Sequence, residues 1–224
     1  MQMDKESNFD QRIDQYICLV PFRFLKGKLQ VPLLKVNKYA EWFLLSKPGF
    51  PSEKNINHMV SEVMLNDTNP TLLSNFPVLA DANTDNPMIE WCQVELLSPQ
   101  DHQSIIVKES CMQLKWFNVA LNEKGQLQIH IKPVHSQFEI MQQSLIQLRN
   151  TVELKQFNAI RQLIGDEFTL NDLKRCLGAL QPIYLTTNNS NLRRKLNKYI
   201  VPTARKQMGN PGHPSKIYRW KEES

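Results

Sequence analysis

Apolar residues recur at helical spacing in three successive segments in the last third of the chain. Their positions are Leu154, Phe157, Ile160, Leu163 and Ile164, then Leu170, Leu173, Leu177 and Leu180, then Leu192, Leu196, Tyr199 and Ile200. This spacing puts the apolar side chains of each segment on one face of a helix. Gly165 interrupts the first pattern and Pro182 closes the second, while Thr169 and Asp172 have the form of a capping box. We therefore predict three helices.

Polar and basic residues occupy the other side of the third predicted helix. The polar run 186–190 offers several N-caps for it. Its outward residues are Asn191, Arg194, Lys195 and Lys198, with Arg193 beside them. Strand patterns at 202–207 and 216–220 then flank a turn rich in Gly and Pro, which predicts a β-hairpin. Helices followed by such a hairpin predict a C-terminal winged helix-turn-helix domain, to which we assign residues 147–224.

Strand-like patterns dominate the first 146 residues. Two of them, 18–24 and 29–36, are joined by a short turn, and three more are expected at 89–96, 111–119 and 127–131. Apolar residues at helical spacing predict one amphipathic helix after Pro51 and a long helix from Phe138; they are Ile56, Met59, Val60, Val63 and Met64, then Met141, Leu145, Leu148 and Val152. This order of elements predicts an α+β chain whose N-terminal domain, residues 1–146, is a mixed α/β sandwich.

The positive charge is concentrated at the C-terminal end. The 224 residues carry a net charge of +5, yet no carboxylate occurs between Asp172 and Glu222. From Asn188 onward nine basic residues face two acidic ones, so this segment alone exceeds the charge of the whole chain. Segregated positive charge on a predicted helix and hairpin favours a nucleic-acid partner.

Other classes of protein are disfavoured by the composition. No apolar stretch approaches the roughly 20 residues that span a bilayer, and the start of the sequence lacks the pattern of a signal peptide, so we expect a cytoplasmic protein without a membrane partner. The four cysteines, Cys18, Cys92, Cys111 and Cys176, form no C-x-x-C pair. That spacing fits neither a disulfide scaffold nor a zinc site, and we expect no metal or other cofactor.

Nine residues of the C-terminal module are candidates for contacting DNA: Asn191, Arg193, Arg194, Lys195, Lys198, Arg205, Lys206, His213 and Lys216. Asn and Arg side chains on the outer face of a helix can bond base edges in the major groove. Basic residues of the hairpin can meet phosphates, which supply affinity more than sequence choice. Two alternatives stay open: a solvated surface helix, and a nonspecific RNA-binding or scaffold protein that uses the basic segment only for its charge.

Several motifs in their order along the chain resemble the Nudix-related transcriptional regulators. The N-terminal motifs are Leu33-Leu34-Lys35, Trp42, Pro48-Gly49-Phe50 and Trp116-Phe117, and the C-terminal ones are Asn191-x-Arg-Arg-Lys-Leu196 and Gly212-x-Pro-x-Lys-Ile-Tyr-Arg219. The resemblance covers nearly the whole chain. It implies a Nudix-like sensing domain joined by a bridging helix to the winged helix. One branch of that family senses nicotinamide-linked nucleotides and another senses sugars, and this sequence is more similar to the second.

The sequence departs from the catalytic motif of that family. A Nudix box holds divalent metal ions with clustered carboxylates, but counting from Gly49 leaves only Asp67 acidic where acid is needed. Since one carboxylate cannot build a multi-metal diphosphatase site, we expect no enzymatic activity. The alternatives that stay open are a metal-dependent ADP-ribose hydrolase with a nucleic-acid-binding tail and a nucleotide-sensing regulator of NAD metabolism.

The ancestral cleft of such a domain could still bind an effector. Aromatic rings can stack on a sugar, polar side chains can bond its hydroxyls, and a histidine before the bridging helix could relay the ligand state; the candidates are Lys35, Trp42, Lys47, Glu53, Trp91 and His135. The resemblance implies a homodimeric repressor of sugar catabolism that responds to a pentose such as L-arabinose and binds a palindromic double-stranded operator.

Overall fold

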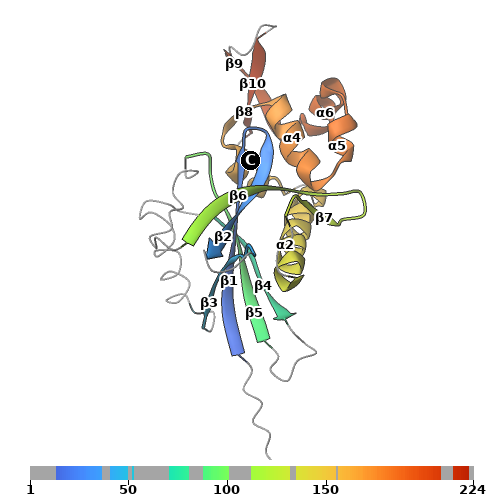
Figure 1. Ribbon diagram of the computed structural model, residues 1–224. Coiled ribbons are helices and arrows are strands. Elements are labelled where there is room, and N and C mark those ends of the chain that lie inside the picture. The colour runs from blue at the N-terminus through green and yellow to red at the C-terminus, as the bar shows by residue number, and fades with distance from the viewer. Residues whose placement is uncertain are drawn as a thin grey trace, which may run out of the picture.

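The computed structural model describes residues 14–36, 41–49, 52, 71–80, 88–100, 112–131, 135–154, 156–207 and 214–221. Within these residues, one sheet has seven strands and a second has three (Figure 1). The strands of the larger sheet are β1 (Asp14–Leu25), β2 (Lys28–Val36), β3 (Leu45–Pro48), β4 (Thr71–Ala80), β5 (Met88–Leu96), β6 (Met112–Leu121) and β7 (Leu127–Ile129). The chain is therefore mixed α/β, as the sequence predicts.

The long first strand organises the larger sheet. The strand order is β4-β5-β1-β2-β6-β7, with β3 also paired to β1. β1 runs parallel to β5 from Asp14 opposite Met88 to Phe22 opposite Leu96, and antiparallel to β2 and β3. Its first half pairs with β3 and its last three residues pair with β2. One edge of β1 thus changes partner midway, so that the sheet divides there.

Three of the described strands were not anticipated from the sequence: β3, β4 and the short strand β8 (Glu167–Thr169). β4 lies at an edge of the sheet and pairs with β5 alone. It contains Pro77, which lacks the backbone N–H that a central strand needs but is tolerated at a sheet edge. That proline lowers the strand signal of the sequence, although Leu73, Phe76 and Val78 pack on the core.

Helix α2 (His135–Glu153) lies against the larger sheet (Figure 1). It begins three residues before Phe138, where the sequence predicts its start, and the proposed domain boundary at 146/147 falls within it. Its residues Ile140, Met141 and Leu145 are fully buried. They belong to a cluster of buried apolar side chains that extends from the sheet to the C-terminal helices. A smaller cluster, made of Ile17, Leu19, Leu34 and Leu45, is separate from it.

The C-terminal module contains four short helices and the three-stranded sheet. After α2 come α3 (Asn158–Ile164), β8, α4 (Leu170–Leu180), α5 (Ile183–Thr186), α6 (Asn189–Leu196), β9 (Ile200–Gln207) and β10 (Ser215–Trp220). The small sheet has the order β8-β10-β9. The predicted capping box opens α4, because the Thr169 hydroxyl accepts from the Asp172 N–H and the Asp172 carboxylate accepts from the Thr169 N–H.

Three details of the predicted helices are wrong. Leu154 is 69% exposed and lies beyond the end of α2 instead of on the buried face of α3. The four-residue helix α5 follows Pro182, in a segment where no helix was predicted. The third helix ends at Leu196, so Lys198 and Tyr199 lie in the following turn and Ile200 begins β9. Ile200 is nevertheless buried, which explains its place in the apolar pattern.

Three of the four cysteines, Cys18, Cys92 and Cys176, are described; they are buried and free, and they pack in the main core. Among the described helices, none combines the length and the apolar character needed to cross a membrane.

Candidate nucleic-acid interface

Helix α6 presents a polar face to solvent because its apolar residues anchor the opposite side. Leu192 and Leu196 are 0% and 4% exposed and belong to the main core. The helix begins at a defined cap, where the Asn188 side chain accepts a hydrogen bond from the Asn191 N–H at 2.8 Å. Four of the predicted contact residues are exposed on this helix: Asn191, Arg193, Arg194 and Lys195.

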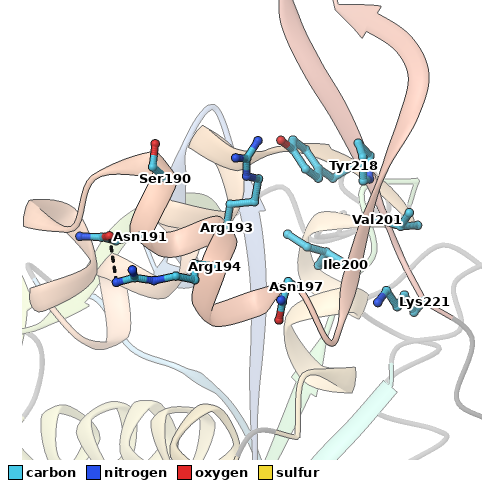
Figure 2. A pocket seen from close by; sticks show the side chains of 10 residues that line it. Ser190, Asn191, Arg193, Arg194, Asn197, Ile200, Val201, Tyr218 and Lys221 are labelled. Atoms are coloured by element: carbon cyan, nitrogen blue, oxygen red, sulfur yellow. Dashed lines mark hydrogen bonds between the residues drawn. The ribbon is translucent and has the colours of Figure 1, made fainter.

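A groove of about 660 Å³ separates α6 from the β9–β10 hairpin (Figure 2). Its walls are Ser190, Asn191, Arg193, Arg194 and Asn197 from the α6 side, and Ile200, Val201, Pro202, Tyr218 and Lys221 from the hairpin side. Three of these side chains are basic and no wall residue is acidic. The groove therefore favours an anionic or polar ligand over an apolar one.

The Arg194 guanidinium donates a hydrogen bond to the Asn191 carboxamide oxygen at 3.3 Å (Figure 2). The two residues are three positions apart, so they lie together on the exposed face of the helix. An asparagine that bonds adenine in two places needs both its oxygen and its amino group. The oxygen has two lone pairs, so it can accept such a contact while it keeps the bond from Arg194, which orients the carboxamide.

The hairpin adds further basic residues, of which Arg205 is paired with a carboxylate. Arg205 on β9 makes two hydrogen bonds of 3.2 Å from its Nη1 to both carboxylate oxygens of Glu167 on β8. Its charge is thus partly neutralised within the module, which the sequence did not indicate. Lys216 is exposed on β10, and the strand register pairs it with Lys206. Like charges in opposed positions disfavour strand pairing unless an anion lies near them.

Two of the predicted contact residues are less fully described. Lys206 lies on β9, but its side chain is outside the described part of the structure, and so is the whole of His213. Lys198 is exposed in the turn after α6 and is not on the helix itself.

An aromatic cluster holds the hairpin against the helices. The Trp220 ring lies 6.0 Å from the Phe157 ring and 4.8 Å from the Phe168 ring, measured between centroids. Its Nε1 donates a hydrogen bond of 3.0 Å to the Gly165 carbonyl. The Tyr199 ring packs edge-on against Phe157 at 4.8 Å. These contacts come from four parts of the module, so they fix the position of the hairpin relative to α6.

Sequence reasoning missed the groove residues Ser190, Asn197 and Lys221. Lys221 follows the predicted strand directly, and its N–H donates to the Tyr199 carbonyl at 2.8 Å. The pairing of Trp220 with Ile200 brings it beside α6. That register cannot be read from local spacing. The predicted hairpin could still have indicated Lys221, because this basic residue directly follows its second strand.

The predicted effector residues are not gathered in one place. Lys35 lies near Trp42, with its Nζ 5.9 Å from the indole centroid, and Trp42 packs edge-on against Phe117 at 4.9 Å in the main core. Trp91 lies on β5, where it donates from Nε1 to the Gln15 side chain at 3.2 Å. It alternates with the core residue Cys92, so it points to the opposite face of the sheet from the core that holds Trp42. The structure does not support joint stacking by the two tryptophans.

The side chains of the other three effector candidates, Lys47, Glu53 and His135, lie outside the described part of the structure. Lys47 lies in β3 and His135 begins α2, while Glu53 falls outside the described residues. Most of the segment compared with the Nudix box, including Asp67, also falls outside them, so the absence of enzymatic activity that we infer from its missing carboxylates remains a prediction. Within the described ranges, no group of three or more His, Cys, Asp or Glu could hold a metal ion.

A buried polar pair on β5 was also missed. Glu95 is 2% exposed, and one of its oxygens accepts from Gln93 Nε2 at 2.8 Å. Among the described residues, its other oxygen has no hydrogen-bond partner. Burial raises the pKa of the Glu95 carboxyl to about 7, and the bond from Gln93 opposes that rise. The alternation of polar and apolar residues in 89–96 was the available signal.

Similar proteins were found only by comparison with solved structures. No protein-family model matches the chain, and no curated protein matches it. Among solved structures, a MutT/nudix family protein from Enterococcus faecalis has a TM-score of 0.64 at 15% identity, covering 99% of this chain and 90% of the other. Shewanella oneidensis NrtR, crystallised with a 27mer DNA, has a TM-score of 0.59 at 17% identity, covering 92% of this chain and 93% of the other. NrtR without DNA gives 0.58 at 17% identity. The chain therefore has the fold of these proteins, including a Nudix-like mixed α/β domain.

Proposed function

We propose that the chain is a DNA-binding transcriptional regulator. The observation that carries the proposal is the exposed Asn and Arg face of α6 beside the basic groove, mounted on a buried apolar face. In this proposal α3, β8, α4, α6, β9 and β10 form a winged helix, with α6 as the recognition helix and β9–β10 as the wing. Support comes from the shared fold with NrtR, a protein crystallised with DNA.

In this proposal α6 enters the major groove. Asn191, Arg193 and Arg194 contact base edges, since asparagine can bond adenine and arginine can bond guanine in two places. Lys195, Lys198 and Lys216 contact phosphates around them. Arg205 joins the phosphate contacts when it exchanges Glu167 for the DNA backbone. We propose that the regulator acts as a homodimer on a palindromic operator, because one module of this size reads only half a site.

The Nudix-like domain supplies the regulatory input in the same proposal. It binds a small effector without hydrolysing it, and binding lowers the affinity for the operator by favouring another arrangement of the two modules. The sequence resemblance favours a pentose such as L-arabinose as the effector. ADP-ribose is the alternative effector that the fold leaves open.

The DNA proposal is tested by selecting binding sites for the purified protein from a random duplex library. We expect a preferred sequence that binds at least 1000-fold more tightly than random DNA at fixed salt. Arg194→Ala should lower specific affinity by about 1–3 kcal/mol and relax the preference at one position. Lys216→Ala should weaken specific and random DNA alike and reduce the salt dependence by about one ion. Recovery of no preferred sequence would refute the proposal in favour of a nonspecific binder.

The effector proposal is tested by thermal-shift measurements with pentoses, hexoses, ADP-ribose and NAD. Stabilisation by a pentose, with unchanged stabilisation in Arg194→Ala, is the expected result, because the two sites lie in different modules. Stabilisation by nucleotides alone would replace the sugar by a nucleotide effector. Turnover of ADP-ribose with magnesium would identify a hydrolase instead.

A further inference from the structure

A second cavity lies where the larger sheet meets the C-terminal helices. This junction cavity has a volume of about 450 Å³. One wall is the β1–β2 turn with β6 and β7, and the other is formed by α4 and Leu185 of α5. Its polar lining residues are Lys26, Lys28, Asn118, Gln128, His130 and Arg175. None of them belongs to the α6 groove or to the predicted effector site.

The charge of the junction cavity is uncompensated. Lys26, Lys28 and Arg175 each carry a positive charge, and none of the lining residues is Asp or Glu. Within the described residues none of these three side chains forms an ion pair or a side-chain hydrogen bond, whereas Arg149, Arg161 and Arg205 each pair with a carboxylate. Three unpaired cations around one hollow create a local positive potential that attracts an anion.

The backbone of the β1–β2 turn lies close to the Arg175 side chain. Lys26 has a φ of 52° and is the only described non-glycine residue with a positive φ, and Gly27 follows at 75°. A Cβ on Gly27 would lie 2.6 Å from Arg175 Nη1 and 2.7 Å from its Cδ. Glycine adopts this backbone without strain and leaves room for this approach. The turn is therefore pressed against the Arg175 side chain, between two lysines.

The remaining walls suit a small organic molecule. Leu29 and Val119 are buried and form an apolar part of the lining. Asn118 and the exposed Gln128 supply polar side chains next to it. Apolar walls with a few polar groups, in a volume of several hundred Å³, are typical of ligand sites.

We propose that the junction cavity binds a small phosphorylated metabolite, of the size of a sugar phosphate or a nucleoside monophosphate. Its phosphate lies among Lys26, Lys28 and Arg175, because a guanidinium fork and lysine ammonium groups together match a dianionic phosphate. Its organic part lies against Leu29, with Asn118 and Gln128 in reach of its hydroxyl groups. The ligand thereby bridges the sheet and α4, and stabilises the contact between the Nudix-like domain and the C-terminal module.

The test is isothermal titration calorimetry of the full-length protein with inorganic phosphate, ribose 5-phosphate and AMP. We expect at least one organic phosphate to bind more tightly than inorganic phosphate. Lys28→Gln and Arg175→Gln should each weaken that binding about tenfold or more. Lys174→Gln removes the same charge from the same helix outside the cavity, and Arg194→Gln removes one from the α6 groove; both should leave the affinity within about twofold. The Gly27 amide resonance should shift on binding in an ¹⁵N spectrum.

The possible outcomes distinguish binding in the junction cavity from nonspecific attraction of phosphate to basic residues. Absence of binding by all three probes would overturn the proposal. So would an equal loss in Lys174→Gln, which indicates nonspecific attraction, or a loss in Arg194→Gln alone, which assigns the phosphate to the α6 groove. Circular dichroism melts of each variant identify any that fail to fold. If Arg175→Gln fails, Lys28→Gln decides the matter, because Lys28 is exposed and has no described partner.

Discussion

The outer face of α6 and the buried stretch of β5 use polar side chains in opposite ways. On α6, Arg193 and Arg194 remain charged in solvent and are available to an external partner. On β5, Glu95 is nearly inaccessible, and its pKa is raised to about 7 by burial. The residue type alone does not decide which occurs. Only the apolar face of the helix is buried, so its polar face stays in solvent. Residues on both faces of β5 are buried, so its polar side chains are also removed from water.

The largest expected effect comes from removing a side chain of the aromatic cluster that holds the hairpin beside the exposed face of α6. Trp220→Ala should lower the free energy of unfolding by about 3–5 kcal/mol, because Trp220 fills space among Phe157, Phe168 and the Gly165 carbonyl. Trp220→Phe is the control, since it keeps the ring packing and loses the hydrogen bond. Urea denaturation should show one transition that shifts as a whole, because the buried cluster extends from the sheet into the C-terminal module. Two transitions, with only one displaced, would mean that the modules unfold independently.

Glu95→Gln tests the buried side of the comparison and should raise stability above neutral pH. The carboxyl ionises near 4.5 in the unfolded chain and near 7 in the folded one. Between these values the folded protein holds an extra proton, so its stability falls as the pH rises, by roughly 3 kcal/mol in full. The glutamine variant lacks this loss. Thermal melts from pH 4 to pH 8 should therefore nearly coincide at pH 4, diverge progressively between about pH 4.5 and pH 7, and stay apart above pH 7. Parallel curves across the range would show that Glu95 is not buried as described.

Thr169→Ala should cost about 1 kcal/mol by removing the N-cap of α4. This helix carries Arg175 of the junction cavity and packs against α6, so the variant tests how far local capping supports the exposed face. Thr169→Ser retains the hydroxyl and should lose much less. Chemical denaturation measures both, and equal losses in the two variants would point to packing of the threonine methyl group instead of capping.

The smallest expected effect concerns Arg205 on β9, which forms an ion pair with Glu167. Because the pair with Glu167 is solvent-exposed, Arg205→Ala should change stability by less than about 0.5 kcal/mol. Glu167→Gln frees the arginine and should modestly strengthen DNA binding at low salt. Fluorescence anisotropy with a labelled duplex measures this, with Asp166→Gln as a neighbouring control for the lost charge. Weaker binding in Glu167→Gln would assign the pair a positioning role.

Local patterns carried most of what could be predicted from the sequence. The capping box of α4 and the inward leucines of α6 are set by residues three or four positions apart, so periodicity finds them. β4 was missed because Pro77 breaks its strand signal, although its position at a sheet edge tolerates the proline. The placement of Trp42 and Trp91 depends on the register of strands far apart in the chain, which no local pattern contains. The exposure of the α6 side chains follows from such local spacing, whereas the relative placement of the two tryptophans does not.

The parallel pairing of β1 with β5 also sets an order of events in time. Asp14 lies opposite Met88, so about half of the N-terminal domain separates these two paired residues along the chain. At a synthesis rate of about 5–20 residues per second, β1 waits several seconds on the ribosome for its parallel partner. The antiparallel β1–β2 hairpin can form within microseconds of its emergence. The Lys26–Gly27 turn is therefore present first, and the central strand of the nascent sheet keeps one unpaired edge until β5 has been made.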